Sequence, residues 1–93
     1  MRREILYSRS FMRASKRIGK KNPTAADAIE ATLQALADDA FHPALKTHKL
    51  KGELKDQRSC SGGYDLRIVF ELVEHEDREA ILLLSVGTHD DVY

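Results

Sequence analysis

Hydrophobic and polar side chains alternate along residues 64–72, which is the period of a strand that buries one face. The buried face is predicted to carry Leu66, Ile68, Phe70 and Leu72. The opposite face is predicted to carry Asp65, Arg67, Val69 and Glu71. A second apolar run follows at residues 80–86, after a charged tip at residues 75–78. We therefore expect a hairpin whose loop has about four to six residues.

Two helices are predicted before this hairpin, after a short first strand at residues 4–7. Ser8 and Ser10 are both suitable N-caps for a helix that reaches about residue 20. Asn22 and Pro23 suit the cap and the first turn of a second, alanine-rich helix that ends near residue 39. Each helix has an apolar stripe, so we expect the pair to cover one face of the sheet.

The remaining segments complete a small sheet. Residues 41–45 read as an ordered loop, and residues 58–61 as a strand that pairs with the central one across Gly62 and Gly63. The run at residues 80–86 is apolar on both sides, as in a central or covered strand. We predict an α+β fold of order β-α-α-β-β-β, with an antiparallel sheet covered on one face by two N-terminal helices. Residues 1–93 are expected to form a single domain.

Charge is balanced overall but unevenly distributed. The chain has 15 basic and 15 acidic residues, yet residues 2–21 hold eight Lys or Arg against the single acid Glu4. Acids gather at residues 38–39, 71–79 and 90–91. The single cysteine, Cys60, excludes an intramolecular disulfide and a site of several cysteines. No N-terminal apolar run is long enough for a signal peptide or a membrane span, so a reducing cytoplasm is expected.

Several side chains could serve phosphate chemistry. Basic groups neutralise a phosphate, histidine transfers protons near neutral pH, and tyrosine stacks on a base. Candidates for catalysis are His48, Asp65, Arg67, His89 and Tyr93. Candidates for RNA contact are Lys46, Lys49, Lys51, Lys55 and Arg58. No metal site and no cofactor site is expected, and no glycosidase carboxylate pair, phosphate-binding glycine loop or serine elbow is present.

Each of these residues also has an ordinary structural explanation. A lone histidine in a loop is usually a polar surface residue, and scattered lysines usually keep a surface soluble. Asp65 and Arg67 could pair with each other on one strand face. Tyr93 could close the core, and Cys60 is best explained as a small buried hydrophobe.

Taken together, the motifs of the second half resemble the RelE/ParE superfamily of bacterial type II toxins, and within it the YafQ branch. The resemblance rests on His48-Lys-Leu-Lys-Gly52, Arg58, Gly63-Tyr-Asp-Leu-Arg-Ile-Val-Phe70 and the closing Leu83-Leu-Ser-Val-Gly-Thr-His-Asp-Asp-Val-Tyr93. It extends over essentially the whole chain, and the order of the elements agrees with it.

This resemblance implies a ribosome-dependent mRNA endonuclease whose partners are the mRNA, the ribosomal RNA and a cognate antitoxin. In that family the 2′-OH of the RNA attacks the adjacent phosphate without a metal. By position, His48 and His89 would be the acid and base, Asp65 the strand aspartate and Tyr93 the terminal aromatic. Arg67 would stabilise the pentavalent phosphate, and Arg58 with Lys49 or Lys51 would contact the substrate. The antitoxin would neutralise the basic segment at residues 46–55.

The chain also departs from the family pattern. Ser59 and Ser61 stand where YafQ-like members carry an aspartate and a histidine, so one proton-transfer group is missing. Zero net charge is unusual for a protein that binds ribosomal RNA. Two alternatives therefore stay open: a ParE-like non-enzymatic inhibitor of DNA gyrase, and an inactive toxin retained as a partner of its antitoxin.

Overall fold

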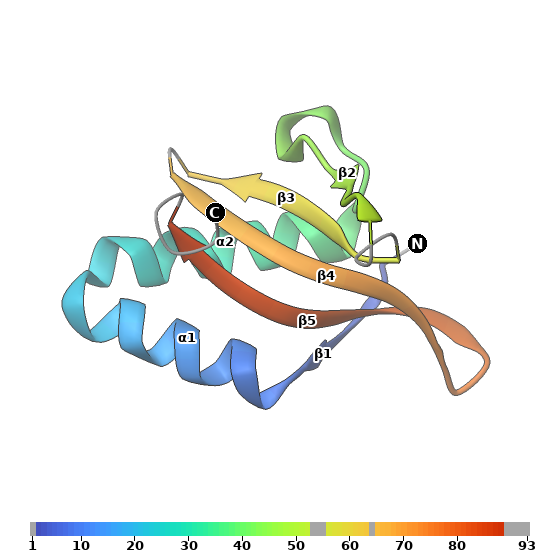
Figure 1. Ribbon diagram of the computed structural model, residues 1–93, viewed down its shortest axis with the longest axis horizontal. Coiled ribbons are helices and arrows are strands. Elements are labelled where there is room, and N and C mark those ends of the chain that lie inside the picture. Colours follow the sequence, from blue (N-terminus) through green and yellow to red (C-terminus); the bar gives the residue numbers. More distant parts are fainter. Residues whose placement is uncertain (1, 53–55, 64, 89–93) are drawn as a thin grey trace.

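The computed structural model describes residues 2–52, 56–63 and 65–88. In chain order the elements are β1 (Glu4–Tyr7), α1 (Arg9–Lys21), α2 (Pro23–Asp38), the short 3₁₀ helix η1 (Pro43–Leu45), β2 (His48–Lys49), β3 (Arg58–Gly62), β4 (Leu66–His75) and β5 (Arg78–Thr88). The strands form one sheet, and the two helices lie together on one side of it (Figure 1). The predicted α+β class and the helical cover are confirmed.

The sheet has the order β1-β5-β4-β3-β2, so β4 is its middle strand and β5 is the interior strand between β1 and β4. Strands β2 to β5 pair in antiparallel fashion, whereas β1 lies parallel to β5. The sheet is therefore mixed rather than wholly antiparallel. The reason is that both helices follow β1, so no hairpin turn joins it to its neighbour, and only a long connection of this kind permits a parallel pair.

Side-chain caps set the limits of the two helices. The Ser8 hydroxyl accepts the backbone N–H of Phe11 at 3.1 Å, which makes Ser8, rather than Ser10, the N-cap of α1. The Asn22 side chain accepts the N–H of Ala25 at 3.2 Å, while the Asn22 backbone N–H closes the last turn of α1. One residue thus ends the first helix and begins the second, and Pro23 occupies the first turn as predicted.

The hydrophobic core lies between the helices and the covered face of the sheet. Its largest fully buried side chains include Phe11, Leu36, Ile68, Phe70, Ile81 and Leu83. Among the glycines that the structure describes, Gly62 makes the closest approach to a neighbouring element: a Cβ built on it would lie 2.0 Å from the Thr32 hydroxyl oxygen in α2. Glycine at this position lets the helix pack directly onto the strand.

The β4–β5 hairpin differs from its prediction in length and regularity. His75 still pairs with Arg78, so the loop has two residues, Glu76 and Asp77, and not four to six. Both adopt positive φ angles, 52° and 66°, which is the backbone of a tight hairpin turn. Pairing shifts between Val69–Ser85 and Phe70–Leu83, which leaves Leu84 as an extra residue in β5. This bulge bends and twists the ribbon.

Two further boundaries differ from the sequence-based expectation. The two-residue strand β2 was expected only as part of a basic loop, because so short a segment has no periodicity to detect. β4 begins at Leu66, so Asp65 lies in the turn before the strand and not within it. Among the described residues, no helix has the length and apolar character needed to cross a membrane.

Candidate nucleic-acid interface

The helix-free face of the sheet carries two candidate residues. Cross-strand partners share a face, so His48 in β2, Ser59 in β3 and Val69 in β4 stand in one row on the side opposite the core residue Ile68. Arg67 lies two residues from Val69 on the same side, with Ser61 as its partner in β3. Ser59 and Ser61 in β3 therefore lie between His48 and Arg67.

The register sets how far apart these two candidates are. His48 and Arg67 are separated by two strand spacings across the sheet and by two residues along it. With spacings of about 4.8 Å and 3.3 Å, their Cα atoms are about 12 Å apart. A histidine and an arginine at that distance on one face are long enough to meet at a single phosphodiester. The sheet thus places these two candidate residues on one face.

The orientation of His48 is set by the turn that precedes it. Its Nδ1 lies 3.0 Å from the carbonyl oxygen of Lys46, a residue that ends η1 with φ at 52°. A carbonyl oxygen only accepts, so Nδ1 is the protonated nitrogen of the ring in this contact. Nε2 is then the nitrogen that exchanges a proton with a ligand. The exposed imidazole is placed to act as base or acid.

Arg67 and Asp65 flank the first residue of β4. The guanidinium Nη1 of Arg67 donates to the carbonyl oxygen of Leu66 at 3.0 Å. This contact folds the half-buried side chain back along the strand and leaves its other N–H donors for a further acceptor. Asp65 is half-buried in the preceding turn. The turn and the strand together therefore place one carboxylate and one guanidinium at the same end of β4.

The other candidates are placed less uniformly. Lys46, Lys49 and Lys51 are all exposed around the short β2 segment. By register, however, Lys49 pairs with Arg58 and points to the side opposite His48. His89, Tyr93 and Lys55 lie outside the described residues.

Arg58 lies on the other side of the sheet from Arg67, because its partner in β4 is the core residue Phe70. Its guanidinium carbon is 5.5 Å from the centre of the Phe41 ring, and that of Arg3 is 5.8 Å from the same centre. Such contacts are cation–π interactions. The sequence offered no sign of this cluster, since the three residues come from separate segments and only the fold brings them together.

Cys60 takes no part in the helix-free face. It is fully buried, pairs with Ile68 and packs in the core. Burial raises the pKa of its thiol from 9.0 to about 12, only partly opposed by a hydrogen bond to the Ile68 backbone. A thiol of this kind stays protonated and is no nucleophile, as its interpretation as a small hydrophobe predicted.

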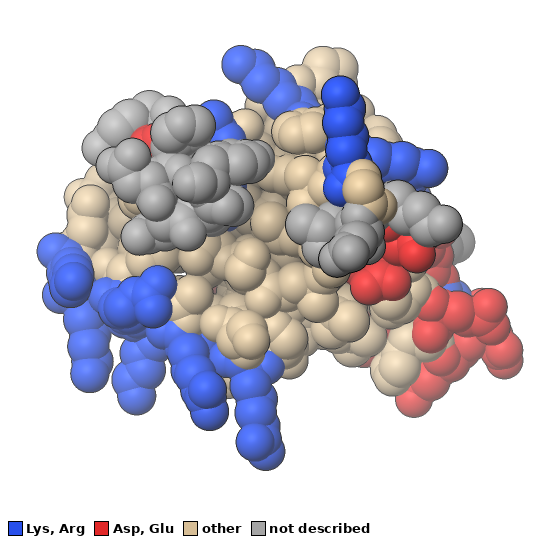
Figure 2. Space-filling model, viewed as in Figure 1, with Lys and Arg blue, Asp and Glu red and all other residues tan. Residues whose placement is uncertain are grey.

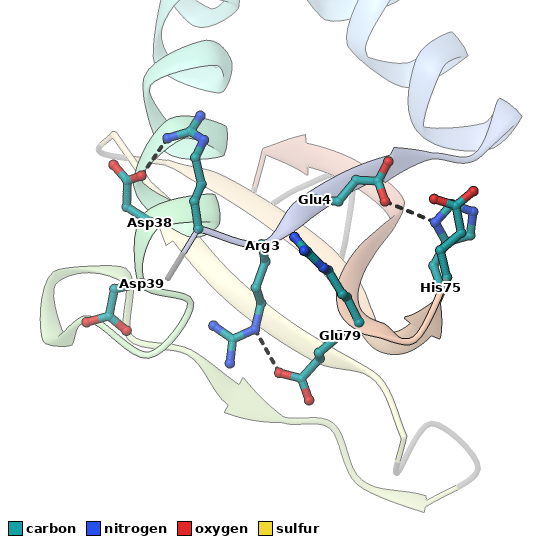
Figure 3. Close-up of a pocket in the computed structure, with 9 residues that line it drawn as sticks. Arg3, Glu4, Asp38, Asp39, His75 and Glu79 are labelled. Carbon is teal, nitrogen blue, oxygen red and sulfur yellow. Dashed lines mark hydrogen bonds and ion pairs between the residues drawn. The ribbon is translucent and has the colours of Figure 1, made fainter.

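A separate hollow lies at the start of β1, beside the turn of the β4–β5 hairpin. Figure 3 shows Arg3 paired with Glu79, and Glu4 with His75, at 2.7 Å and 2.9 Å. Arg2 pairs with Asp38 across the same hollow. Because charges of both signs neutralise one another here, this hollow attracts an anion less than the His48–Arg67 face does. Among the described residues, no group of three His, Cys, Asp or Glu could hold a metal ion.

Comparison with known proteins identifies the relatives of the chain. Residues 3–93 match the family model described as the bacterial toxin of the type II toxin–antitoxin system, YafQ. A search of curated proteins finds no match.

Solved structures with the same fold include YafQ from E. coli BL21(DE3), with 18% identity, a TM-score of 0.76 and 98% of each chain covered. The E. coli DinJ–YafQ complex gives 19% identity, a TM-score of 0.76 and 98% of each chain. A YoeB/ParE toxin from Agrobacterium tumefaciens gives 13% identity and a TM-score of 0.77, covering 92% of this chain and 98% of that one.

Proposed function

Because the chain belongs to the YafQ family of bacterial type II toxins, we propose that it is an endoribonuclease that cleaves mRNA on the ribosome. The observation that carries this proposal is the common face of His48 and Arg67, and exposed lysines flank β2 on either side along the chain. Such a face suits a phosphodiester whose own 2′-OH is the nucleophile, since the protein then supplies only proton transfer and positive charge. The substrate implies action in the cytoplasm.

The roles follow from the positions of the groups. Nε2 of His48 takes the proton of the 2′-OH, or gives one to the departing 5′-oxygen. Arg67 donates to the phosphate oxygens, on which negative charge grows in the transition state. Ser59 is fully buried and Ser61 half-buried, so neither replaces the missing acid or base. A second proton-transfer group is assigned to His89, at the Gly-Thr-His position of the family.

A cognate antitoxin is the proposed protein partner, since the DinJ–YafQ complex joins a relative to its own. We expect its acidic residues to face the exposed lysines around β2. The neighbouring reading frame tests this directly. A small partner without an acidic segment would contradict the expected charge match.

The decisive experiment compares the candidate site with a matched pair at the far end of the same sheet. His48→Ala and Arg67→Ala should each lower cleavage of ribosome-bound mRNA by about 10²–10³-fold, the usual cost of losing one acid–base group or one charge stabiliser. His75→Ala and Arg78→Ala remove the same residue types at the β4–β5 turn and should leave cleavage unchanged. Primer extension measures the cut, and circular dichroism checks the fold.

Intact mRNA and normal growth with the wild-type chain would overturn the proposal. Equal losses in both pairs would instead move the site away from the helix-free face. The alternative, a ParE-like inhibitor, is favoured only by the YoeB/ParE relative in the comparison. A gyrase supercoiling assay separates the two, because an mRNA endonuclease leaves supercoiling unaffected at concentrations that stop growth.

A further inference from the structure

Three side chains from distant parts of the chain meet at the start of β3. They are Arg3 just before β1, Phe41 in the turn after α2, and Arg58, the first residue of β3. The guanidinium carbons of Arg3 and Arg58 lie 5.8 Å and 5.5 Å from the centre of the Phe41 ring. We call these three residues the Phe41 cluster.

The Phe41 ring is held in place without being buried. The backbone N–H of Phe41 donates to the Asp39 carboxylate at 3.1 Å, which fixes the turn that follows α2. The ring is still 50% exposed, as one of three exposed large apolar side chains among the described residues. An exposed ring whose position is already fixed loses little conformational entropy when a partner covers it.

The two arginines of the cluster differ in their partners. Nε of Arg3 donates to Glu79 at 2.7 Å, so a carboxylate of the protein already neutralises this guanidinium (Figure 3). The Arg58 guanidinium, in contrast, has no hydrogen bond or ion pair with any other residue that the structure describes. Arg58 is nevertheless half-buried. Because it has lost part of its water, its N–H donors favour an acceptor from outside the chain.

Lys49 adds a second cation on the same side of the sheet. It is exposed, and it is the cross-strand partner of Arg58. Figure 2 shows basic side chains at the upper right, where Figure 1 places β2, and acidic side chains at the lower right, where the β4–β5 turn lies. The start of β3 therefore presents positive charge next to an exposed aromatic ring, apart from the acidic end of the molecule.

We propose that the Phe41 cluster, with Lys49 beside it, holds an acidic segment of the antitoxin, and that Arg58 receives one of its carboxylates. A carboxylate matches two parallel N–H groups of a guanidinium, and stacking on the Phe41 ring fixes the plane in which they point. The inference rests on the proposed function, because it states where the proposed protein partner is held.

The composition of the cluster favours a protein over RNA. Arginine and aromatic residues are enriched among the residues that dominate the energy of protein interfaces. Binding of an RNA backbone needs several free cations in a row, and Arg58 and Lys49 are the two members of this group without an ion pair in the described part of the chain. The cluster also lies on the side of the sheet opposite His48 and Arg67, since Arg58 pairs with the core residue Phe70.

A partner held at this cluster is close to the proposed cleavage site. Strand β2 is the outermost strand of the sheet, and its two residues, His48 and Lys49, point to opposite sides. A segment bound at Lys49 and Arg58 therefore has to pass only this short strand to reach His48. The antitoxin can cover the imidazole without contacting Arg67.

The test measures the affinity of the purified chain for the protein encoded by the neighbouring reading frame, by isothermal titration calorimetry. Arg58→Lys keeps the charge but removes the two parallel N–H groups, and should weaken binding by at least about 10-fold. Phe41→Leu keeps an apolar side chain but removes the ring, and should weaken it by about 3–10-fold. The matched control is Arg78→Lys at the β4–β5 turn, where the arginine is exposed, and it should leave the affinity unchanged.

The carboxylate is identified from the antitoxin side. Each Glu or Asp of the antitoxin is changed to Gln or Asn and combined with Arg58→Lys in a double-mutant cycle. One of them should couple to Arg58 and show no coupling to Arg78. Circular dichroism checks that each variant is folded.

Wild-type affinity in both Arg58→Lys and Phe41→Leu would overturn the proposal, as would the lack of any antitoxin carboxylate that couples to Arg58. If Phe41→Leu lowers mRNA cleavage while its affinity for the antitoxin is unchanged, the cluster serves RNA and the proposal also fails. The proposed function stands or falls separately. A wild-type chain that leaves mRNA intact but binds the antitoxin through Arg58 refutes the endonuclease and leaves this surface in place.

Discussion

The contact between α2 and the end of β3 gives the sharpest test of the packing. An alanine Cβ at position 62 would lie 2.0 Å from Oγ1, 2.8 Å from Cγ2 and 2.9 Å from Cβ of Thr32. Carbon atoms in favourable contact are about 3.5–4.0 Å apart. Rotation of the threonine side chain relieves the first two contacts but not the third. The backbone of α2 must therefore move away from β3 by at least about 0.5 Å.

The cost follows from two effects of Gly62→Ala. Forcing an extra methyl group into a packed core costs about 1–3 kcal/mol. Rotating Thr32 also breaks its 2.7 Å hydrogen bond to the carbonyl oxygen of Ala28, and a buried hydroxyl without a partner costs about 1–3 kcal/mol. We expect a loss of about 2–6 kcal/mol in the free energy of unfolding. For a domain of this size, that lowers the melting temperature by at least about 8 °C.

The assay is thermal and urea denaturation followed by circular dichroism, with Gly19→Ala as the matched control. A Cβ at Gly19 would meet only the Ala26 Cβ, at 3.4 Å, and alanine is the better helix former by about 1 kcal/mol. The two Gly→Ala changes should therefore have opposite signs. Thr32→Ala should recover at least about 1 kcal/mol in the Gly62→Ala background, as expected of side chains in contact. A Gly62→Ala protein whose free energy of unfolding lies within about 0.5 kcal/mol of the wild-type value would refute the reasoning. Such a result would mean that position 62 and Thr32 are not in close, rigid contact.

Three further predictions concern stability. The pKa of the Cys60 thiol is near 9 in the unfolded chain and about 12 in the folded one. Between these values the free energy of unfolding of the wild type should therefore fall by about 1.4 kcal/mol per pH unit relative to Cys60→Ala. Parallel pH profiles of the two proteins would contradict this. Replacing Glu76-Asp77 by Asn-Gly should stabilise the hairpin turn by about 1 kcal/mol in urea denaturation, since both positions have positive φ; a loss of stability would argue against that backbone. Ser8→Ala should cost about 1 kcal/mol by removing the cap of α1, whereas Ser10→Ala should cost less; the reverse order would contradict the capping assignment.

The sequence predicted best those features that depend on neighbouring residues. Ser8 was one of two possible caps, the junction at Asn22 and Pro23 was unambiguous, and the alternation of β4 identified its buried face correctly. The parallel pairing of β1 was missed because it joins segments at opposite ends of the chain. The two-residue turn was missed because Glu76 and Asp77 are not the usual residues for positive φ.

The positions of the candidate residues in the sheet were predictable in part for the same reason. Alternation placed Arg67 on the helix-free face, and the register then brought His48 to the same side. The side taken by Arg58 depends on where β3 begins relative to β4, and a shift of one residue reverses it. Its stacking on Phe41 also depends on where α2 ends. Neither quantity can be calculated from the local sequence.

The pairing of β1 with β5 determines how late in its synthesis the chain can complete its sheet. Arg3 and Glu79, which meet at this pair, are 76 residues apart, and the strand that joins β1 to the rest of the sheet is the last one made. At translation speeds of 5–20 residues per second, roughly 4–14 s pass between the synthesis of β1 and that of β5. During that time the helices have no finished sheet beneath them. The sheet of a nascent chain is thus incomplete, and β1 unpaired, until the final strand emerges from the ribosome.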